Sequence, residues 1–267
     1  MKRKRNFYLA FAILSIVLVP RAVSAQESKG DEARFASEAA VKLNNEGVAL
    51  AEIGKLSEAA DAFRAAITVK PDYALAYSNL GNVLFRAGRI SEAAAALKKS
   101  IDLKCKYPEN YNKLGFIYLE AGKLDEAIKL FNAALILDPN FVPALYNLGN
   151  ALERRAKYKE AVVVLKRAVG LEPGNVILRW ELGIVLSNQK KYAAAIGELK
   201  EAIRLEPENL QIQLVLGQIY VLSGDRPGAR KQYEKIVQLD PHLAKRLYAA
   251  IYSNLLVAVE DQQQPKK

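Results

Sequence analysis

The sequence predicts an all-α protein, a solenoid of six helix–turn–helix repeats with one further helix after them. Glycines recur at one constant interval, an alanine follows each glycine at a fixed offset, and a large apolar residue stands one helical turn after each alanine. One helix pair of this kind cannot bury its apolar face alone, so the repeats must stack. The recurrent glycines are Gly47, Gly81, Gly115, Gly149, Gly183 and Gly217.

Residues 1–25 have the composition of a secretory signal peptide. Four basic residues at positions 2–5 precede thirteen mostly apolar residues, and the small residues Val23, Ser24 and Ala25 follow. This is the order of a cleaved export signal. A helix of that apolar length spans about 20 Å, short of the roughly 30 Å core of a bilayer, which disfavours the alternative of an uncleaved membrane anchor. We therefore expect an exported protein, periplasmic or secreted, and a bacterial source fits best.

The repeats follow residues 26–39, for which we expect a polar linker and the lead-in to the first helix. Glycine and alanine at the recurrent positions let the two helices of a repeat approach closely. A proline at a constant offset from the glycine ends the second helix in five repeats, and Cys105 replaces it in the second repeat. Turn glycines separate the two helices in four repeats, whereas Ala156 and Lys190 replace them in the fourth and fifth. The predicted repeats span 40–73, 74–107, 108–141, 142–175, 176–209 and 210–243.

This pattern resembles the tetratricopeptide repeat, which has Leu-Gly, Tyr, Ala, Phe and Pro at fixed offsets in a unit of about 34 residues. The resemblance covers residues 40–243. It implies a right-handed α-solenoid in which the first helix of each repeat lines a concave face, where such proteins hold peptide ligands. Arg179 and Gln213 occupy a position that is Leu or Tyr in the other repeats, so we expect the last two repeats to pack less well.

Residues 244–260 keep the register of another first helix and predict a capping helix, followed by a disordered polar tail at 261–267. The apolar residues of this helix form two stripes, and one of them can cover the sixth repeat. The second stripe holds Tyr248, Tyr252 and Leu256. Either this stripe is exposed and contacts a partner or a second copy of the chain, or the cap is buried more deeply than usual.

The composition argues against an enzyme and against a nucleic-acid-binding protein. The formal net charge is +10, but five basic residues lie in the first 25 positions, where no acid offsets them. The chain has one cysteine, Cys105, and one histidine, His242, too few for a disulfide or a zinc site. We therefore predict no catalytic residue, no metal site, no cofactor and no nucleic-acid partner. Basic clusters on turns and second helices predict a solvated surface, with contact to an anionic membrane or polymer as the alternative.

Asparagines are frequent at the positions that the resemblance places on the concave face. An amide offers two donors and an acceptor, so a row of them can hold an extended peptide backbone whatever its sequence. The row is similar to the asparagine ladder in the repeats of O-linked N-acetylglucosamine transferase, although Lys113, Glu181 and Val215 interrupt it. The alternative is that these amides bond the backbone of the neighbouring repeat. The candidate residues are Asn45, Asn79, Asn82, Lys113, Asn147 and Asn150.

Aromatic residues form a second group of candidates on the same face. Phe116, Tyr146 and Trp180 belong to consecutive repeats, and side chains of this kind are favoured anchors at recognition sites. The alternative for Trp180 is core packing beside Arg179. These features predict a non-catalytic scaffold that binds a protein or peptide in assembling an envelope complex. The alternative function is a structural homo-oligomer built through the C-terminal helix.

Overall fold

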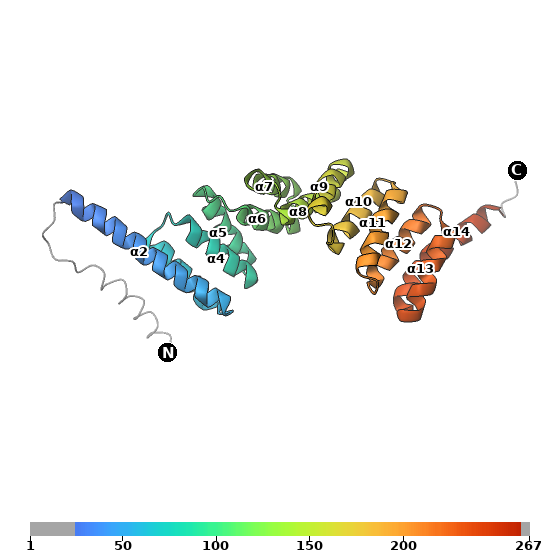
Figure 1. The fold of residues 1–267 in the computed structure, drawn as a ribbon, viewed down its shortest axis with the longest axis horizontal. Coiled ribbons are helices and arrows are strands. Elements are labelled where there is room, and N and C mark those ends of the chain that lie inside the picture. Colours follow the sequence, from blue (N-terminus) through green and yellow to red (C-terminus); the bar gives the residue numbers. More distant parts are fainter. Residues whose placement is uncertain (1–24, 263–267) are drawn as a thin grey trace. The chain divides into compact units, whose positions relative to one another are not determined.

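The computed structural model describes residues 25–262 and contains thirteen α-helices and no strand within that range (Figure 1). The predicted all-α fold of helix–turn–helix units is thereby confirmed. Residues 1–24 of the predicted signal peptide and residues 263–267 of the predicted tail lie outside the described residues. Residues 261–262, which we expected to begin the disordered tail, belong to the last helix. The chain divides into two compact units, residues 1–88 and 89–267, and each is described by itself.

The first unit contains three described helices, α2 (Ala25–Glu52), α3 (Leu56–Val69) and α4 (Ala74–Arg86). Helices α2 and α3 form a pair, and α4 packs against both of them. Helix α2 begins at Ala25, so residues 26–39, for which we expected a polar linker and lead-in, lie within the same helix as the start of the first predicted repeat.

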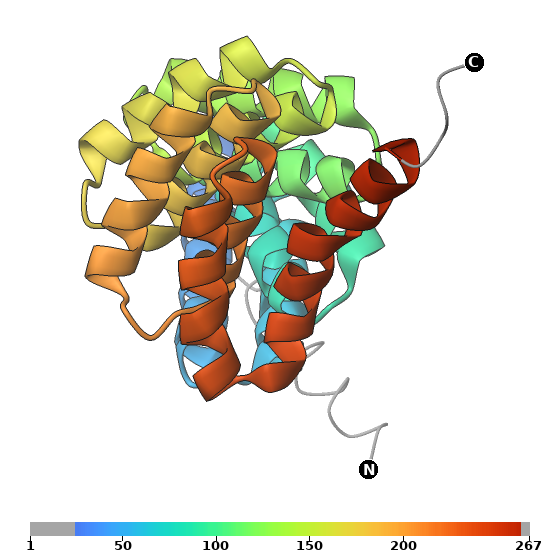
Figure 2. The same cartoon turned by 90° about the vertical axis from the view of Figure 1, so that its right-hand side faces the viewer.

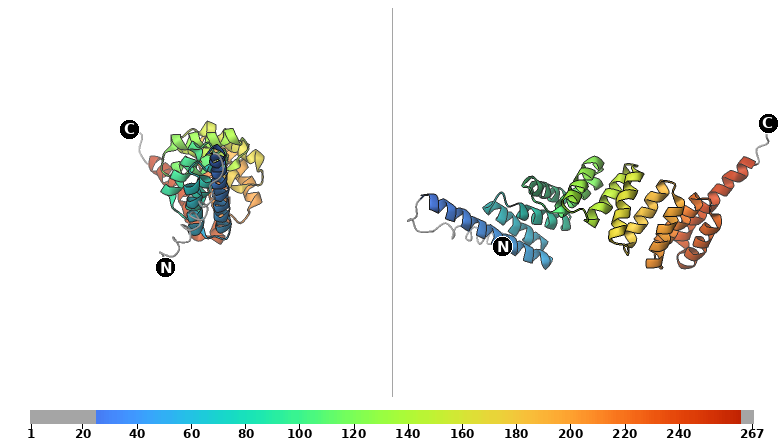
Figure 3. Two further views of the ribbon diagram at one scale, coloured as in Figure 1. Left: turned by 90° about the vertical axis from the view of Figure 1, so that its left-hand side faces the viewer. Right: turned by 45° about the horizontal axis from the view of Figure 1, so that its top comes forward.

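The second unit is a succession of helix pairs that pack on one another along the chain (Figure 3). The pairs are α6 with α7, α8 with α9, α10 with α11, and α12 with α13. The last helix, α14, lies beside α13 and also contacts α12 (Figure 2). The helix bounds are α5 (Ile90–Asp102), α6 (Pro108–Glu120), α7 (Leu124–Leu137), α8 (Val142–Arg154), α9 (Tyr158–Leu171), α10 (Val176–Asn188), α11 (Tyr192–Leu205), α12 (Leu210–Leu222), α13 (Arg226–Leu239) and α14 (Pro241–Gln262).

Close contact between paired helices depends on the recurrent glycines. A Cβ atom built on Gly149 would lie 2.6 Å from Cγ of Leu165 on the partner helix, far inside van der Waals contact. Ala161, the recurrent alanine of the same repeat, is fully buried on that partner helix. The period seen in the sequence is therefore the period of helix–helix contact.

The turns inside the pairs take a left-handed backbone conformation even where glycine is missing. Gly122 and Gly224 have φ of 74° and 80°, and Ala156 and Lys190 adopt φ of 57° and 60° at the equivalent places. A residue with a Cβ costs about 1–2 kcal/mol in this region. The packing of the two helices therefore imposes the left-handed turn, and Ala156 and Lys190 adopt it at a cost in conformational energy.

The two polar departures in the last repeats form hydrogen bonds, although the buried Oε1 of Gln213 has no partner among the described residues. Arg179 donates from Nε to the carbonyl of Pro173 at 2.8 Å and pairs with Glu198 at 2.8 Å. Gln213 donates from Nε2 to the carbonyl of Pro207 at 2.7 Å. In both repeats the side chain bonds the proline that ends the preceding repeat, so a repeat-to-repeat contact replaces the expected apolar one.

Cys105 is buried and has a polar partner. Asn110, which is fully buried on α6, donates from Nδ2 to Sγ of Cys105 at 3.5 Å and to Oγ of Ser100 at 3.2 Å. The cysteine that replaces the usual proline thus lies inside a small polar contact between α5 and α6.

Candidate binding face

The first helices of successive pairs lie next to one another in the second unit. Helix α8 contacts α6 and α10, and α10 contacts α12. We call the surface that α6, α8, α10 and α12 present together the first-helix face. Most of the residues predicted to bind a ligand lie on this face or on its counterpart, α2 and α4, in the first unit.

In the first unit, the asparagines join the two neighbouring first helices. Asn79 on α4 donates from Nδ2 to Oδ1 of Asn44 on α2 at 2.9 Å, and Asn44 is 2% exposed. Arg86 donates to the carbonyl oxygen of Ala51 at 3.2 Å. Both bonds join residues 35 positions apart, so each links one position of a repeat to a fixed position of the previous repeat.

The same two bonds recur in the second unit. Asn147 on α8 donates from Nδ2 to Oδ1 of Asn112 on α6 at 2.9 Å. Arg154 donates to the carbonyl oxygen of Leu119 at 3.4 Å and pairs with Glu120 at 3.2 Å. The amides therefore bond the neighbouring repeat, as the structural alternative predicted, but through an asparagine side chain and not through its backbone.

The remaining predicted polar residues lie at the surface or are half-buried. Asn45 is exposed and lines an open depression on α2 with Val41 and Lys42. Asn82, Lys113 and Asn150 are half-buried. The amide of Asn150 acts to lower the pKa of the Tyr146 phenol, one turn earlier on α8, against the effect of burial.

The aromatic candidates differ in how far they belong to the core. Tyr146 and Trp180 are partly buried and pack against the main apolar cluster of the second unit. Phe116 is 37% exposed on α6. The indole Nε1 of Trp180 is buried, and no hydrogen-bond partner for it exists among the described residues. Trp180 is therefore half core residue and half surface residue, which leaves both predicted roles open.

Sequence reasoning treated Glu181, which is half-buried on α10, as an interruption of the asparagine row and not as a binding residue. Burial raises the pKa of the Glu181 carboxyl, the negative charge of Glu153 raises it further, and Arg154 opposes the shift. The pKa of Tyr146 is also raised, first by burial and then by the charge of Glu181. The phenol of Tyr146 is therefore close enough to the carboxylate of Glu181 for the charge of Glu181 to affect it. The sequence marks Glu181 as the one acidic residue at a repeat position that is asparagine in three of the six repeats.

The end of the second unit carries the predicted oligomer contacts. Leu247 and Ile251 are buried and face the core, while Tyr248 is 49% exposed. The ring of Tyr248 lies 5.7 Å from that of Tyr233 and 4.3 Å from that of Tyr252. Tyr252 is half-buried, and the side chain of Leu256 lies outside the described residues.

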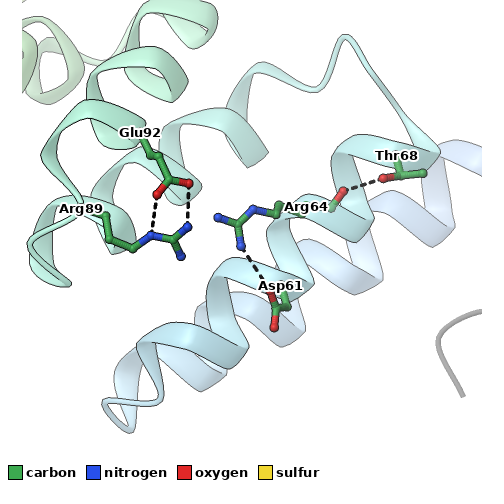
Figure 4. Close-up of polar contacts among 5 residues, drawn as sticks. All are labelled: Asp61, Arg64, Thr68, Arg89 and Glu92. Carbon is green, nitrogen blue, oxygen red and sulfur yellow. Dashed lines mark hydrogen bonds and ion pairs between the residues drawn. The ribbon is translucent and has the colours of Figure 1, made fainter. Parts of the chain in front are cut away.

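Many basic residues on the helix surfaces have acidic neighbours. Arg89 binds Glu92 through two bonds of 2.7 and 2.6 Å, and Arg64 contacts Asp61 at 3.1 Å (Figure 4). Arg155, the residue that caps the C-terminal end of α8, forms an ion pair with Asp125. Local pairing of this kind is typical of a solvated surface.

Side chains of the metal-ligating types do not gather in the part of the chain that the structure describes. No group of three or more His, Cys, Asp or Glu side chains there is placed to hold a metal ion. None of the described helices combines the length and the apolar character that crossing a bilayer requires.

Comparison with protein families finds tetratricopeptide repeats in several parts of the chain. Families described as "Tetratricopeptide repeat" match residues 44–107, 142–175 and 186–251, and one described as "TPR repeat" matches residues 117–155. No curated protein matches the sequence.

Solved structures with the same fold come from several repeat proteins. YrrB, titled a TPR protein with an unusual peptide-binding site, is 20% identical with a TM-score of 0.61, covering 72% of this chain and 97% of its own. PilF from Pseudomonas aeruginosa is 19% identical with a TM-score of 0.65, covering 80% and 99%. MamA from Desulfovibrio magneticus RS-1 is 26% identical with a TM-score of 0.59, covering 63% and 95%.

Proposed function

Because the chain belongs to the tetratricopeptide repeat proteins, with several such repeats in tandem, we propose that it is a non-catalytic scaffold that binds a protein or peptide segment on the first-helix face. The observation that carries this proposal is the recurring pair of hydrogen bonds, each between residues 35 positions apart, which fixes one first helix to the next. A surface already held in place loses little conformational freedom when it binds a ligand.

The side chains on this face suit an extended segment. Asn147 uses one N–H of its amide to bond Asn112, so its second N–H and its carbonyl oxygen remain for a ligand backbone. Phe116 contributes exposed aromatic surface on the neighbouring helix. Polar groups beside an aromatic anchor are the usual composition of a recognition surface.

The cellular setting of this scaffold is a separate part of the proposal. The composition of residues 1–25 supports export, and an exported scaffold would act in assembling a complex of the cell envelope. Fusion of residues 1–25 to a reporter enzyme that is active only outside the cytoplasm tests export. An inactive reporter would remove the envelope role and leave the binding proposal in place.

Capture of partners with the full chain tests the binding proposal. The chain with Asn147→Ala and Asn150→Ala is compared with a control carrying Ile136→Ala and Val163→Ala, two exposed residues on the second helices. We expect the first variant to lose partners that the unchanged chain and the control both capture, while all three keep the same helical circular dichroism. Equal capture by the first variant would show that this face is not the binding site.

A second candidate function is a homo-oligomer built through α14. The exposed ring of Tyr248 and its contacts with Tyr233 and Tyr252 favour it, because such aromatic surface is common where copies meet. Sedimentation of the full chain with and without Tyr248→Glu tests it. A dimer that the substitution converts to a monomer supports this function, and a monomer in both cases excludes it.

A further inference from the structure

We propose that the first-helix face of the second unit selects a peptide segment that places a lysine or arginine side chain against Glu181, with apolar residues on either side of it. This inference rests on the proposed function, because it names the chemistry of the ligand for the same face. It is carried by the way Glu181 departs from the bonding pattern of its neighbours.

Glu181 and Tyr146 occupy the places that two asparagines occupy elsewhere on the first helices. Asn147 bonds Asn112 across 35 positions, and Tyr146 and Glu181 stand at the same separation one repeat later. The side chains that act on Glu181 are those of Glu153 and Arg154, and no hydrogen bond from Tyr146 is among these effects. The contact that joins asparagines in the earlier repeats is therefore absent here, and the carboxylate of Glu181 is not engaged by it.

Glu153, the acidic side chain that acts on Glu181, and Glu120, which lies beside Arg154, already have partners. Glu153 accepts a hydrogen bond from Asn188 at 2.8 Å, and Glu120 pairs with Arg154 at 3.2 Å. Within the part of the chain that the structure describes, the side-chain carboxylate of Glu181 forms no hydrogen bond and no ion pair. Arg154 lies near enough to influence it, but the guanidinium of Arg154 is bonded to α6.

The surroundings of Glu181 make an unpaired carboxylate costly. Ile177 and Ile184 lie one turn before and one turn after it on α10, and Val215 takes the equivalent position on α12. Burial and the charge of Glu153 both raise the pKa of Glu181, so its ionised form is less favourable in the empty site than it is in water. A cation at this point removes that penalty, and an ion pair is strengthened by the apolar surroundings.

The neighbouring side chains suit a basic residue within an otherwise apolar segment. The rings of Tyr146 and Trp180 are partly exposed and can pack against the hydrocarbon stem of lysine or arginine. Ile177 is 57% exposed and Leu222 is 61% exposed, so apolar surface for the adjoining ligand residues lies on α10 and α12. The paired negative charges of Glu153 and Glu181 disfavour an anionic ligand there.

Selection from a random peptide library displayed on phage tests the inference. The bait is the full chain, either unchanged or carrying Glu181→Gln or Glu181→Lys. The matched control is Glu201→Gln, which removes a carboxylate from the second helix α11, where it pairs with Arg204. Circular dichroism of each bait verifies folding, and glutamine is nearly the same size as glutamate, so we expect the fold to persist.

We expect the unchanged chain and the Glu201→Gln control to enrich peptides with lysine or arginine at one position flanked by apolar residues. Glu181→Gln loses that preference and binds the selected peptides about tenfold or more weakly, as expected for a lost charge-assisted hydrogen bond. Glu181→Lys selects aspartate or glutamate at the same position.

Two outcomes would overturn the inference, and they differ in what they say about the proposed function. Selected peptides that lack a basic position, or keep it with Glu181→Gln, contradict the inference while leaving a peptide-binding face. Failure of the unchanged chain to enrich any peptide contradicts the proposed function itself.

Discussion

The first-helix face of the second unit has a polar part on α6 and α8 and a more apolar part on α10 and α12. In the polar part, Asn147 bonds Asn112 and Arg154 bonds Leu119, so polar side chains are used to hold one helix to the next. In the apolar part, the side chains of Ile177 and Leu222 are largely exposed. Glu181 lies where the two parts meet.

The difference shows that one backbone period can serve two purposes. Both parts use the same spacing of glycine and alanine to pair their helices, so the scaffold is common to them. The glycine and alanine spacing does not fix the other side chains on the face. Some of them form hydrogen bonds between helices, and others have no polar partner in the described part of the chain. The following predictions test whether the scaffold is shared and whether the face is divided as described.

The largest expected effect is from adding a methyl group to the helix contact in each part. Gly149→Ala places Cβ 2.6 Å from Cγ of Leu165, and Gly183→Ala places it 2.9 Å from Cγ of Leu199. We expect each to lower the free energy of unfolding by about 1–3 kcal/mol, with the greater loss at Gly149. Urea denaturation measures both. Gly170→Ala, where nothing lies within 4 Å, is the control and should not destabilise.

The next effect concerns the asparagine bond of the polar part. Asn147→Ala removes the hydrogen bond to Asn112, and we expect it to lower the free energy of unfolding by about 1 kcal/mol. A double-mutant cycle with Asn112→Ala isolates the pair, and Asn132→Ala on the exposed surface of α7 is the control. A coupling energy indistinguishable from zero would mean that the bond does not stabilise the polar part.

The strained turns offer a smaller effect of the opposite sign. Ala156→Gly and Lys190→Gly relieve the left-handed conformation in the polar and the apolar part, respectively. Part of the gain is offset because glycine makes the unfolded chain more flexible, so we expect about 0.5–1 kcal/mol of added stability in each. Thermal unfolding measures it, and lower melting temperatures would show that the two turns are not strained.

The smallest effect distinguishes Glu181 from the bonded polar residues. Its pKa in the folded protein lies above the ordinary value of 4.5, so the protonated form stabilises the fold, and that stability is lost as pH rises through the folded pKa. The charged groups acting on Glu181 are Glu153 and Arg154. We expect Glu181→Gln to be slightly more stable than the unchanged chain at neutral pH and no more stable at pH 4. Denaturation curves at both pH values measure this, and a loss of stability at neutral pH would contradict an unpaired carboxylate.

The face shows where sequence reasoning reached the chemistry and where it did not. The column containing Asn79 and Asn147 was recognised, because a fixed period places its members on successive helices. Whether those amides contact a ligand or one another could not be decided, since the rotamer that joins Asn147 to Asn112 depends on the distance between two helices. Glu181 was taken only as an interruption of that row for the same reason: its lack of a side-chain partner is visible only once the hydrogen bonds of Glu153 and Arg154 are known.

The sequence by itself determined the helix–turn–helix units, because Gly149 and its equivalents, which recur at a constant interval, allow two helices to approach closely. The tertiary structure decided what the polar departures do. Arg179 and Gln213 bond the prolines that end the preceding repeats, and Ala156 and Lys190 accept a strained turn. The physical reason is that a repeat period is a local, additive property of the chain, whereas hydrogen-bond partners and burial depend on atoms that only packing brings together.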